Sequence, residues 1–230
     1  MKAAPPHHTF GVSLLARATA DFVRGLCVLR HADPYVTVFG SARMNRNAAI
    51  HRTAIALGSA LSRAGFTVMT GGGPGLMEAV CRGARDAGGR AVGCCISLAV
   101  EQARNRHLDR RVTFRYFFVR KVMLCRRARA FVALPGGLGT LDELFEILTL
   151  IQTERIARLP VVLLGTEYWS PLLTVLRGMA AAGTLDRSDL DHMYLTDDVA
   201  AAVGHIVTGT ASRTVPAGRV SPWADPSIAT

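Results

Sequence analysis

The residues best suited to chemistry form a glycine-rich loop, Pro135–Thr140 (PGGLGT), followed by a stretch of helical character that carries Asp142, Glu143 and Glu146. A helix N-terminus preceded by glycines offers free backbone N–H groups and the positive end of the helix dipole to one phosphate group. The hydroxyl of the final threonine adds a donor at the same place. A structural alternative makes that threonine the N-cap of the helix and Glu143, three residues later, the partner in a capping box. The spacing allows both interpretations, and they do not exclude each other.

Two further loops of small residues, 40–43 (GSAR) and 71–75 (GGGPG), also follow directly on short apolar runs. In an open parallel sheet, the carboxyl ends of the strands form the crevice in which ligands bind. Each glycine lets backbone N–H groups approach a ligand that a Cβ atom would keep at a distance. We therefore expect the three loops to line one concave site at one edge of the sheet.

None of these loops matches the common dinucleotide or ATP motifs. The dinucleotide fingerprint needs GxGxxG after the first strand and an acidic residue after the second, but the first loop reads GSAR and the second run ends in Thr70. No glycine is followed by Lys and then Ser or Thr, so there is no P-loop. The five cysteines form neither a CxxC motif nor a Cys/His pairing. We expect no redox cofactor, no P-loop ATP hydrolysis and no metal.

Short apolar runs alternate along the chain with stretches of helical character, and these elements must position the loops. The predicted strands are 35–39, 66–70, 91–96, 112–118, 130–134 and 160–164. The predicted helices between them are 47–64, 76–87, 120–129, 141–152 and 168–182. Continuous apolar strands separated by helices are typical of a parallel sheet covered on both faces. The predicted fold is therefore α/β: a Rossmann-like, doubly wound parallel sheet with helices on both faces, in a single domain.

The 230 residues suit one large domain with terminal additions. Apolar residues that step by three or four between Leu15 and Leu29 predict an amphipathic helix, so residues 1–34 are expected to form a helical segment that packs on the core. Residues 35–208 are the predicted Rossmann-like domain. Residues 209–230, rich in small and polar residues without periodicity, are expected to form a flexible tail.

The charge balance favours an anionic ligand, because 27 basic residues stand against 17 acidic ones for a net charge of +10. The basic residues are scattered and their densest cluster is only Arg126, Arg127 and Arg129, which makes nucleic acid the less favoured partner. No apolar run reaches the length of a membrane span, and no apolar signal segment follows the N-terminus. We expect a cytoplasmic protein without a membrane partner.

The stretch PGGLGTLDE at 135–143 resembles the PGGxGTxxE signature of the LONELY GUY (LOG) family, whose members are often mislabelled as lysine decarboxylases. The similarity extends in the same order over about residues 35–180, and its last part resembles the longer bacterial branch of the family. The other matching segments are GSAR at 40–43, TGGGPGLMEAV at 70–80, Glu101-Gln102 with Asn105, FFVRK at 117–121, LTLIQT at 148–153 and PVVLLGTEYW at 160–169. One departure is CCISLA at 94–99, where that branch usually has Asn and Pro.

This resemblance implies a phosphoribohydrolase. Such an enzyme hydrolyses the N-glycosidic bond of purine (cytokinin riboside or adenosine) 5′-monophosphates to the free base and ribose 5-phosphate, and it needs no cofactor. Residues 35–208 then become the nucleotide-binding catalytic domain. The resemblance also implies a homodimer or an assembly of dimers, with the site near the subunit interface. The site residues that it implies are Arg120 and Glu143 as the catalytic pair, Gly136, Gly137, Gly139 and Thr140 around the 5′-phosphate, and Glu101, Lys121, Asp142 and Thr149 along the nucleotide.

Cleavage of a ribosyl C–N bond passes through an oxocarbenium-like state with positive charge on the sugar. A nearby carboxylate, here Glu143, stabilises that charge and orients or deprotonates the attacking water. Arg120 has two open roles, a hydrogen bond to the ribose hydroxyls or one to Glu143. A decarboxylase using pyridoxal phosphate would need a Schiff-base lysine, for which Lys121 is the only candidate. The alternatives are a nucleotide sensor or carrier of the same fold and, less favoured, a DNA-binding protein.

Overall fold

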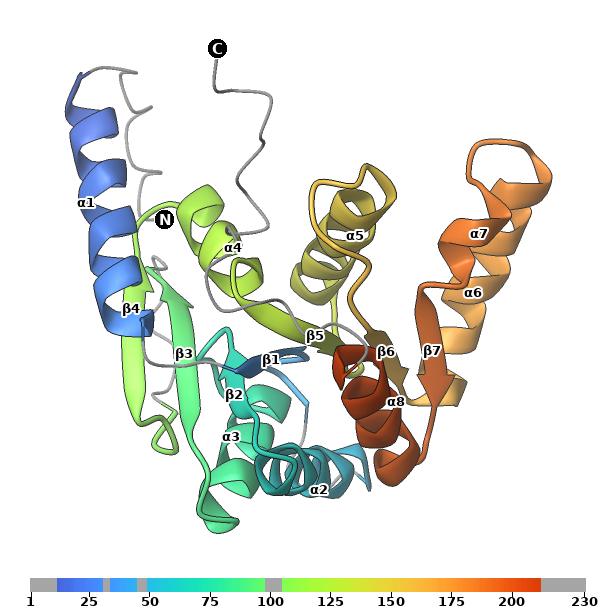
Figure 1. Cartoon of the computed structure of the whole chain (residues 1–230), viewed down its shortest axis with the longest axis horizontal. Coiled ribbons are helices and arrows are strands. Elements are labelled where there is room, and N and C mark those ends of the chain that lie inside the picture. Colours follow the sequence, from blue (N-terminus) through green and yellow to red (C-terminus); the bar gives the residue numbers. More distant parts are fainter. Residues whose placement is uncertain (1–11, 31–33, 45–48, 98–104, 212–230) are drawn as a thin grey trace, which may run out of the picture.

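The computed structural model describes residues 12–30, 34–44, 49–97 and 105–211. In this part of the chain, seven strands form one sheet in the order β4-β3-β2-β1-β5-β6-β7, and every neighbouring pair is parallel (Figure 1). The strands are β1 (Tyr35–Phe39), β2 (Thr67–Thr70), β3 (Ala91–Ile96), β4 (Arg110–Phe114), β5 (Ala128–Ala133), β6 (Val161–Leu164) and β7 (Met193–Thr196). The chain builds outward from β1 to β4 and then returns to the other side of β1 with β5. This doubly wound topology confirms the predicted fold class.

Helices cover both faces of the sheet (Figure 1). One face carries α2 (Ala49–Arg63), α3 (Leu76–Asp86) and α8 (Val199–Ala211); the other carries α1 (Val12–Leu29), α4 (Phe117–Cys125), α5 (Leu138–Gln152), α6 (Thr166–Ala181) and the short α7 (Arg187–Leu190). Side chains of a strand alternate between the faces, so Phe39 joins the core under α4 and α5 while Val38 joins the core under α2 and α3. The two cores share one sheet, as expected for a single domain.

The N-terminal helix is attached to the sheet edge by a buried aspartate. Asp21 on α1 is 1% exposed, and its carboxylate accepts a hydrogen bond of 2.8 Å from the backbone N–H of Arg115, just beyond β4. Arg24 pairs with Asp21 at 2.9 Å and also reaches the carbonyl of Thr113. The expected N-terminal helix therefore exists and packs on β4 and α4. None of the described helices is long and apolar enough to span a membrane.

Several predicted boundaries around α4 and α5 were wrong. The strand expected at 112–118 ends at Phe114, because Phe117 and Phe118 form the exposed first turn of α4 rather than a continuation of the strand. The helix expected at 120–129 ends at Cys125, since β5 already begins at Ala128. The helix expected at 141–152 begins three residues earlier, at Leu138. These shifts place Arg120 and Thr140 inside the first turns of their helices.

The C-terminal third contains elements that the sequence did not predict. Strand β7 has four half-buried residues at the edge of the sheet, too few for a recognisable alternation. Helix α8 is apolar along most of its length and ends at Ala211, three residues beyond the expected domain boundary. Both elements belong to the same sheet and core, and apart from the last three residues of α8 they lie within the predicted domain of residues 35–208.

Candidate active site

Three loops meet at the carboxyl ends of the adjacent strands β2, β1 and β5. The N–H of Ser41, after β1, donates to the carbonyl of Pro135, after β5, at 3.0 Å. The N–H of Leu76, after the GGGPG loop, donates to the carbonyl of Ser41 at 2.9 Å. The expectation that these loops share one edge of the sheet is confirmed. The reversal of strand order between β1 and β5 is the position at which doubly wound sheets bind ligands.

The N-terminus of α5 presents unpaired backbone donors. Gly137 is the N-cap and the cap has no side-chain hydrogen bond, while the N–H groups of Thr140 and Leu141 both donate to the Gly137 carbonyl. Within the described ranges, the N–H groups of Gly137, Leu138 and Gly139 have no acceptor. The capping-box alternative is therefore wrong, because helix α5 begins before Thr140. The free amides and the helix dipole are suited to one anionic group.

Gly136 is required by the packing of Thr140. A Cβ atom at position 136 would overlap with the Thr140 hydroxyl oxygen and lie 2.7 Å from the Thr140 Cβ and 3.0 Å from the Ser41 nitrogen. By contrast, a Cβ at Gly137 or Gly139 would meet nothing within 4 Å. The threonine hydroxyl thus lies against the glycine loop, and the outer side of the loop is open.

The central feature of the site is a buried ion pair between α4 and α5. Nη1 of Arg120 donates to Oε1 of Glu143 at 2.6 Å, and Nε of Arg120 donates to the Cys94 carbonyl at 2.9 Å. Glu143 is 4% exposed, and its Oε2 has no hydrogen-bond partner among the described residues. A Cβ at Gly71 would lie 2.6 Å from Nη2 of Arg120, so the second glycine loop makes room for the guanidinium. The pair leaves one buried carboxylate oxygen unsatisfied, and a ligand group or water that reached it would complete its hydrogen bonding.

Burial raises the pKa of Glu143 above its ordinary value, and the positive charges of Arg120 and Lys121 oppose this shift. The negative charges of Glu146 and Asp142 add to it. A carboxylate with a raised pKa and an unpaired oxygen is a better proton acceptor than an ordinary surface glutamate. The geometry therefore suits a general base that is held in its ionised form by an arginine.

A second cluster flanks this pair. Nζ of Lys121 lies 2.9 Å from Oδ1 of Asp142 and 3.2 Å from Oε2 of Glu146. Desolvation lowers the pKa of Lys121, but its interactions with Asp142 and Glu146 outweigh this and raise the pKa overall. Glu146 is a site residue that our assignment of roles missed. Its position, one turn after Glu143 on the same helix, is the signal that could have identified it.

Comparison with known proteins matches residues 77–206 to a family model described as "Possible lysine decarboxylase". A cytokinin riboside 5′-monophosphate phosphoribohydrolase of Rhodococcoides fascians is 30% identical over 174 residues, which are 74% of this chain and 88% of that protein. A protein of the same name from Mycobacterium marinum is 32% identical over 146 residues, 63% of this chain and 78% of that protein. The chain belongs to the LOG family. The sequence resemblance is confirmed.

Solved structures support the fold of this LOG protein. TM1055, a structural genomics target, is 27% identical with a TM-score of 0.59, and the match covers 76% of this chain and 99% of that one. A molybdenum cofactor binding protein of Rippkaea orientalis is 21% identical with a TM-score of 0.57, covering 76% of this chain and 96% of that one. At such identity the second match shows a shared fold only.

The decarboxylase description of the family model finds no support in the chemistry of this LOG chain. Lys121 is the only lysine in the part of the chain that the structure describes, and its amine is held by two carboxylates. Its pKa is raised, whereas a lysine that forms a Schiff base needs a lowered pKa so that the neutral amine is available.

Two of the residues implied by the LOG resemblance are not placed at the ion pair. Thr149 is exposed and lies two turns after Asp142, on the same face of α5. Glu101 lies outside the described residues. At the departure from the family pattern, the Cys94 thiol is fully buried and contacts the sulfur of Met69 at 3.4 Å. The Cys94 position contacts Arg120 through its backbone carbonyl.

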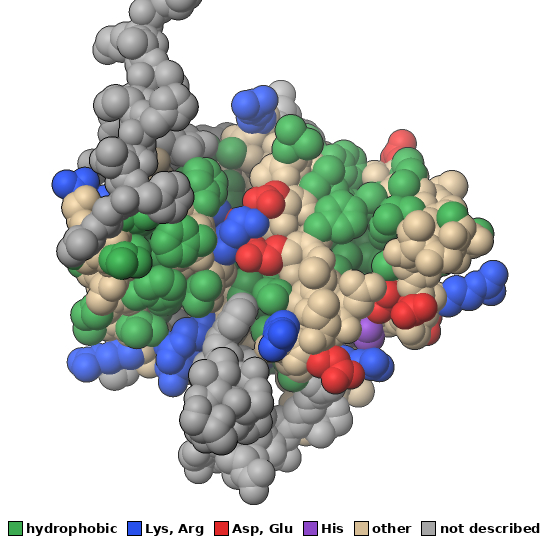
Figure 2. Space-filling model, turned by 90° about the horizontal axis from the view of Figure 1, so that it is seen from above, with side chains coloured by type: hydrophobic (Ala, Val, Ile, Leu, Met, Phe, Trp, Pro, Cys, Tyr) green, Lys and Arg blue, Asp and Glu red, His purple; other side chains and the backbone are tan. Residues whose placement is uncertain are grey.

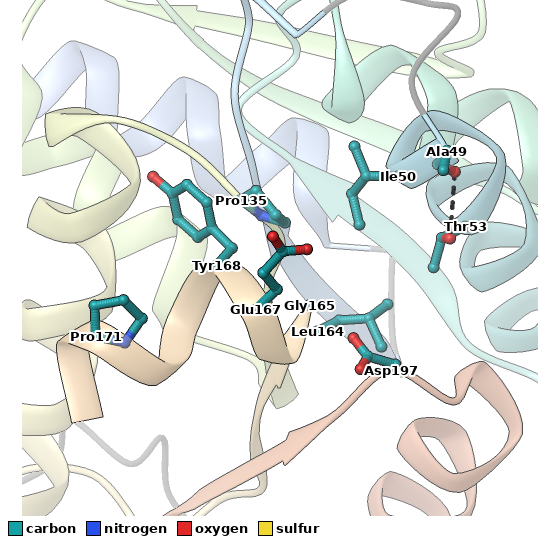
Figure 3. A pocket seen from close by; sticks show the side chains of 10 residues that line it. All are labelled: Ala49, Ile50, Thr53, Pro135, Leu164, Gly165, Glu167, Tyr168, Pro171 and Asp197. Carbon is teal, nitrogen blue, oxygen red and sulfur yellow. Dashed lines mark hydrogen bonds between the residues drawn. The ribbon is translucent and has the colours of Figure 1, made fainter. Parts of the chain in front are cut away.

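A cavity of about 620 Å³ lies beside Pro135, between the N-terminal turns of α2 and α6 (Figure 3). Its lining residues are Ala49, Ile50, Thr53, Pro135, Leu164, Gly165, Glu167, Tyr168, Pro171 and Asp197. Among the residues that the structure describes, the lining includes two carboxylates and no Lys or Arg, which suits a phosphate group poorly. The free amides of α5 remain the better anion site in this LOG chain.

We expect Gly136→Ala to weaken substrate binding about 10- to 100-fold, because displacement of the loop costs a charge-assisted amide–phosphate hydrogen bond. Crowding against Thr140 should also lower the free energy of unfolding by about 1–3 kcal/mol. Isothermal titration with ribose 5-phosphate and denaturant unfolding measure the two effects. Gly178→Ala on α6 is the control, since its new Cβ meets nothing within 4 Å. An unchanged affinity in the Gly136 variant would contradict the loop assignment.

We expect Lys121→Met to move the acidic limb of the pH–rate profile to higher pH. Lys121 lowers the pKa of Glu143, so its removal raises that pKa and the carboxylate ionises later as pH increases. The shift should be smaller than that caused by loss of Arg120, which contacts the carboxylate directly. Arg82→Met, which breaks the exposed ion pair with Asp86 on α3, is the control and should leave the pH–rate profile unchanged. A shift toward lower pH would contradict this electrostatic role.

Proposed function

We propose that the protein is a nucleoside 5′-monophosphate phosphoribohydrolase. It hydrolyses the N-glycosidic bond of purine nucleotides of the cytokinin riboside or adenosine type and releases the free base and ribose 5-phosphate. The observation that carries the proposal is the buried, unpaired Oε2 of Glu143, one helical turn beyond the free amides of Gly137 and Gly139. A rise of 1.5 Å per residue separates the backbones of Gly139 and Glu143 by about 6 Å along α5.

In this arrangement, the amides bind the 5′-phosphate and thereby fix the ribose against Glu143. As the C1′–N bond breaks, positive charge develops on the sugar, and the carboxylate stabilises it. The unpaired oxygen of Glu143 accepts a proton from the attacking water, whose oxygen bonds to C1′. The base leaves with the bonding electrons and takes up a proton from solvent, and Glu143 then returns its proton to solvent, so that one water is consumed overall. Arg120 holds the other oxygen of Glu143 and keeps the carboxylate ionised.

The relatives support the same reaction, since those from Rhodococcoides fascians and Mycobacterium marinum are named cytokinin riboside 5′-monophosphate phosphoribohydrolases. A carrier that binds without turnover is the second candidate, because a molybdenum cofactor binding protein shares the fold. A carrier does not need a buried carboxylate with a raised pKa, whose ionisation costs stability. The ion pair of Arg120 and Glu143 therefore favours a catalytic function over a carrier function.

The test is to incubate the protein with AMP, isopentenyladenosine 5′-monophosphate and adenosine, and to quantify the products by chromatography. We expect equal amounts of free base and ribose 5-phosphate from at least one monophosphate, and little or none from adenosine. Tight binding without release would identify a carrier, and release of inorganic phosphate would identify a phosphatase. Salt-dependent retention of single-stranded DNA without base release would favour the DNA-binding alternative.

We further propose a homodimer or an assembly of dimers. Figure 2 shows hydrophobic side chains on both sides of a small group of charged side chains on the upper face of the molecule. Large exposed apolar residues of α1, α4, α5 and α6 include Leu15, Phe117, Phe118, Leu138 and Val175. A second subunit would bury such surface next to the site. The five cysteines are free, which fits the reducing cytoplasm that we propose as its location.

A further inference from the structure

We propose that Tyr168 is a positioning residue that orients the phosphate-binding amides of the PGGLGT loop. This inference rests on the proposed function for the identity of the ligand. Tyr168 lies in the first turn of α6, and its hydroxyl donates to the carbonyl of Gly136 at 2.6 Å. Its ring lines the cavity beside Pro135, while its hydroxyl points away from Glu167 and Asp197 (Figure 3). The hydroxyl therefore binds the loop and does not point into the cavity.

The hydrogen bond acts through the geometry of one peptide unit. The carbonyl of Gly136 and the N–H of Gly137 belong to the same planar trans peptide, so they point in opposite directions. A donor that holds the carbonyl toward α6 also directs the N–H to the opposite side of the loop, where the other free amides begin α5. Because glycines flank this peptide, its orientation is weakly restrained by sterics. A flipped peptide would present a carbonyl oxygen where the anion needs a donor.

The first turn of α6 is itself held firmly. The N–H of Thr166 donates to Oδ1 of Asp197 at 2.7 Å, and its hydroxyl donates to the other carboxylate oxygen. Nε1 of Trp169, a residue only 1% exposed, donates to the Ala133 carbonyl at 3.1 Å. Helix α6 thus contacts the chain both before and after Pro135. The Tyr168 and Trp169 rings also meet edge to face, with centroids 5.0 Å apart.

Pro135 and Gly165 fill the space between these two attachments. Gly165 has a φ of +115°, and a Cβ at this position would lie 3.3 Å from Cγ of Pro135. The Pro135 carbonyl is held in turn by the N–H of Ser41 at 3.0 Å. Neighbouring peptides of the loop are therefore fixed from two sides, by the β1 loop at Pro135 and by α6 at Gly136. Tyr168 supplies the second restraint.

The test is Tyr168→Phe, which removes one oxygen and retains the ring against Trp169. We expect the affinity for ribose 5-phosphate and for inorganic phosphate, measured by isothermal titration, to fall about 5- to 10-fold with the loss of one hydrogen bond. Affinity for adenine should be unchanged. KM for the nucleotide should rise with little change in kcat, because the loop binds the phosphate in both ground and transition states.

Tyr194→Phe on β7 is the matched control, since that ring stacks on His205 at 4.4 Å and lies two strands from β5, which the loop follows. This control variant should change neither the affinity for ribose 5-phosphate nor the affinity for inorganic phosphate. Unchanged phosphate affinity in Tyr168→Phe, or an equal loss for adenine and ribose 5-phosphate, would overturn the proposal. The titrations need no turnover. A wild-type protein that binds ribose 5-phosphate without hydrolysing AMP would refute the proposed function and leave the role of Tyr168 open to the same measurement.

Discussion

Replacement of Glu143 by Gln is expected to reduce kcat by on the order of 10³-fold, with nucleotide binding retained. The amide is nearly isosteric and its oxygen can still accept from Arg120, so the hydrogen bond to the arginine persists. What is lost is the negative charge beside the sugar and the proton acceptor for water. Single-turnover measurements with AMP test the rate, and titration with AMP tests the binding. Retention of more than about a tenth of the wild-type rate would contradict the proposed role.

The same variant has a stability signature that separates loss of chemistry from misfolding. The pKa of Glu143 is higher in the folded state than in the unfolded state. The free energy of unfolding therefore falls as pH rises from the ordinary pKa through the raised one. Gln carries no such cost. We expect Glu143→Gln to unfold at an equal or higher temperature than the wild type at pH 7.5. This advantage should disappear below pH 4.5, the ordinary pKa of the side chain, where the wild-type carboxyl is protonated in both states.

Arg120→Ala is expected to reduce kcat by about 10²- to 10³-fold and to move the acidic limb of the pH–rate profile to higher pH. The guanidinium opposes the burial that raises the pKa of Glu143, so its loss raises that pKa further. An uncompensated buried carboxylate costs about 3–5 kcal/mol if it stays charged. Destabilisation should therefore be larger at high pH than at low pH.

The double variant Arg120→Ala/Glu143→Gln provides the control for this prediction. If the damage in Arg120→Ala comes from the unpaired carboxylate, the second change should restore part of the lost stability without restoring activity. Thermal unfolding of the four proteins at pH 5 and pH 8 measures the coupling. If the second change adds no more stability to Arg120→Ala than Glu143→Gln adds to the wild type, Arg120 acts through packing against Gly71 and the Cys94 carbonyl rather than through charge.

The part of the site that follows from local sequence was predictable. Parallel strands bring their carboxyl ends to one edge, so three glycine loops after three apolar runs had to meet there, as the Ser41–Pro135 hydrogen bond shows. The contact between Arg120 and Glu143 joins residues 23 positions apart on two helices. Spacing could not predict it, because it depends on how α4 and α5 pack on the sheet. Only the family resemblance paired these residues.

The errors also have physical causes. Phe117 and Phe118 continue an apolar run and so extended the predicted strand, yet they lie exposed on the first turn of α4. Thr140 has the residue type and spacing of an N-cap, but α5 begins before it at Leu138. Tyr168 has no sequence signal as a partner of the loop. Its role depends on α6 lying beside β5, a neighbour that the sequence alone does not identify.

The most direct test of the central arrangement is a crystal structure of Glu143→Gln with AMP bound. We predict the 5′-phosphate within hydrogen-bond distance of the N–H groups of Gly137 and Gly139, and the ribose C1′ facing the side chain at position 143. A phosphate bound instead in the cavity lined by Ile50 and Asp197, or a ribose turned away from α5, would contradict the proposed hydrolysis.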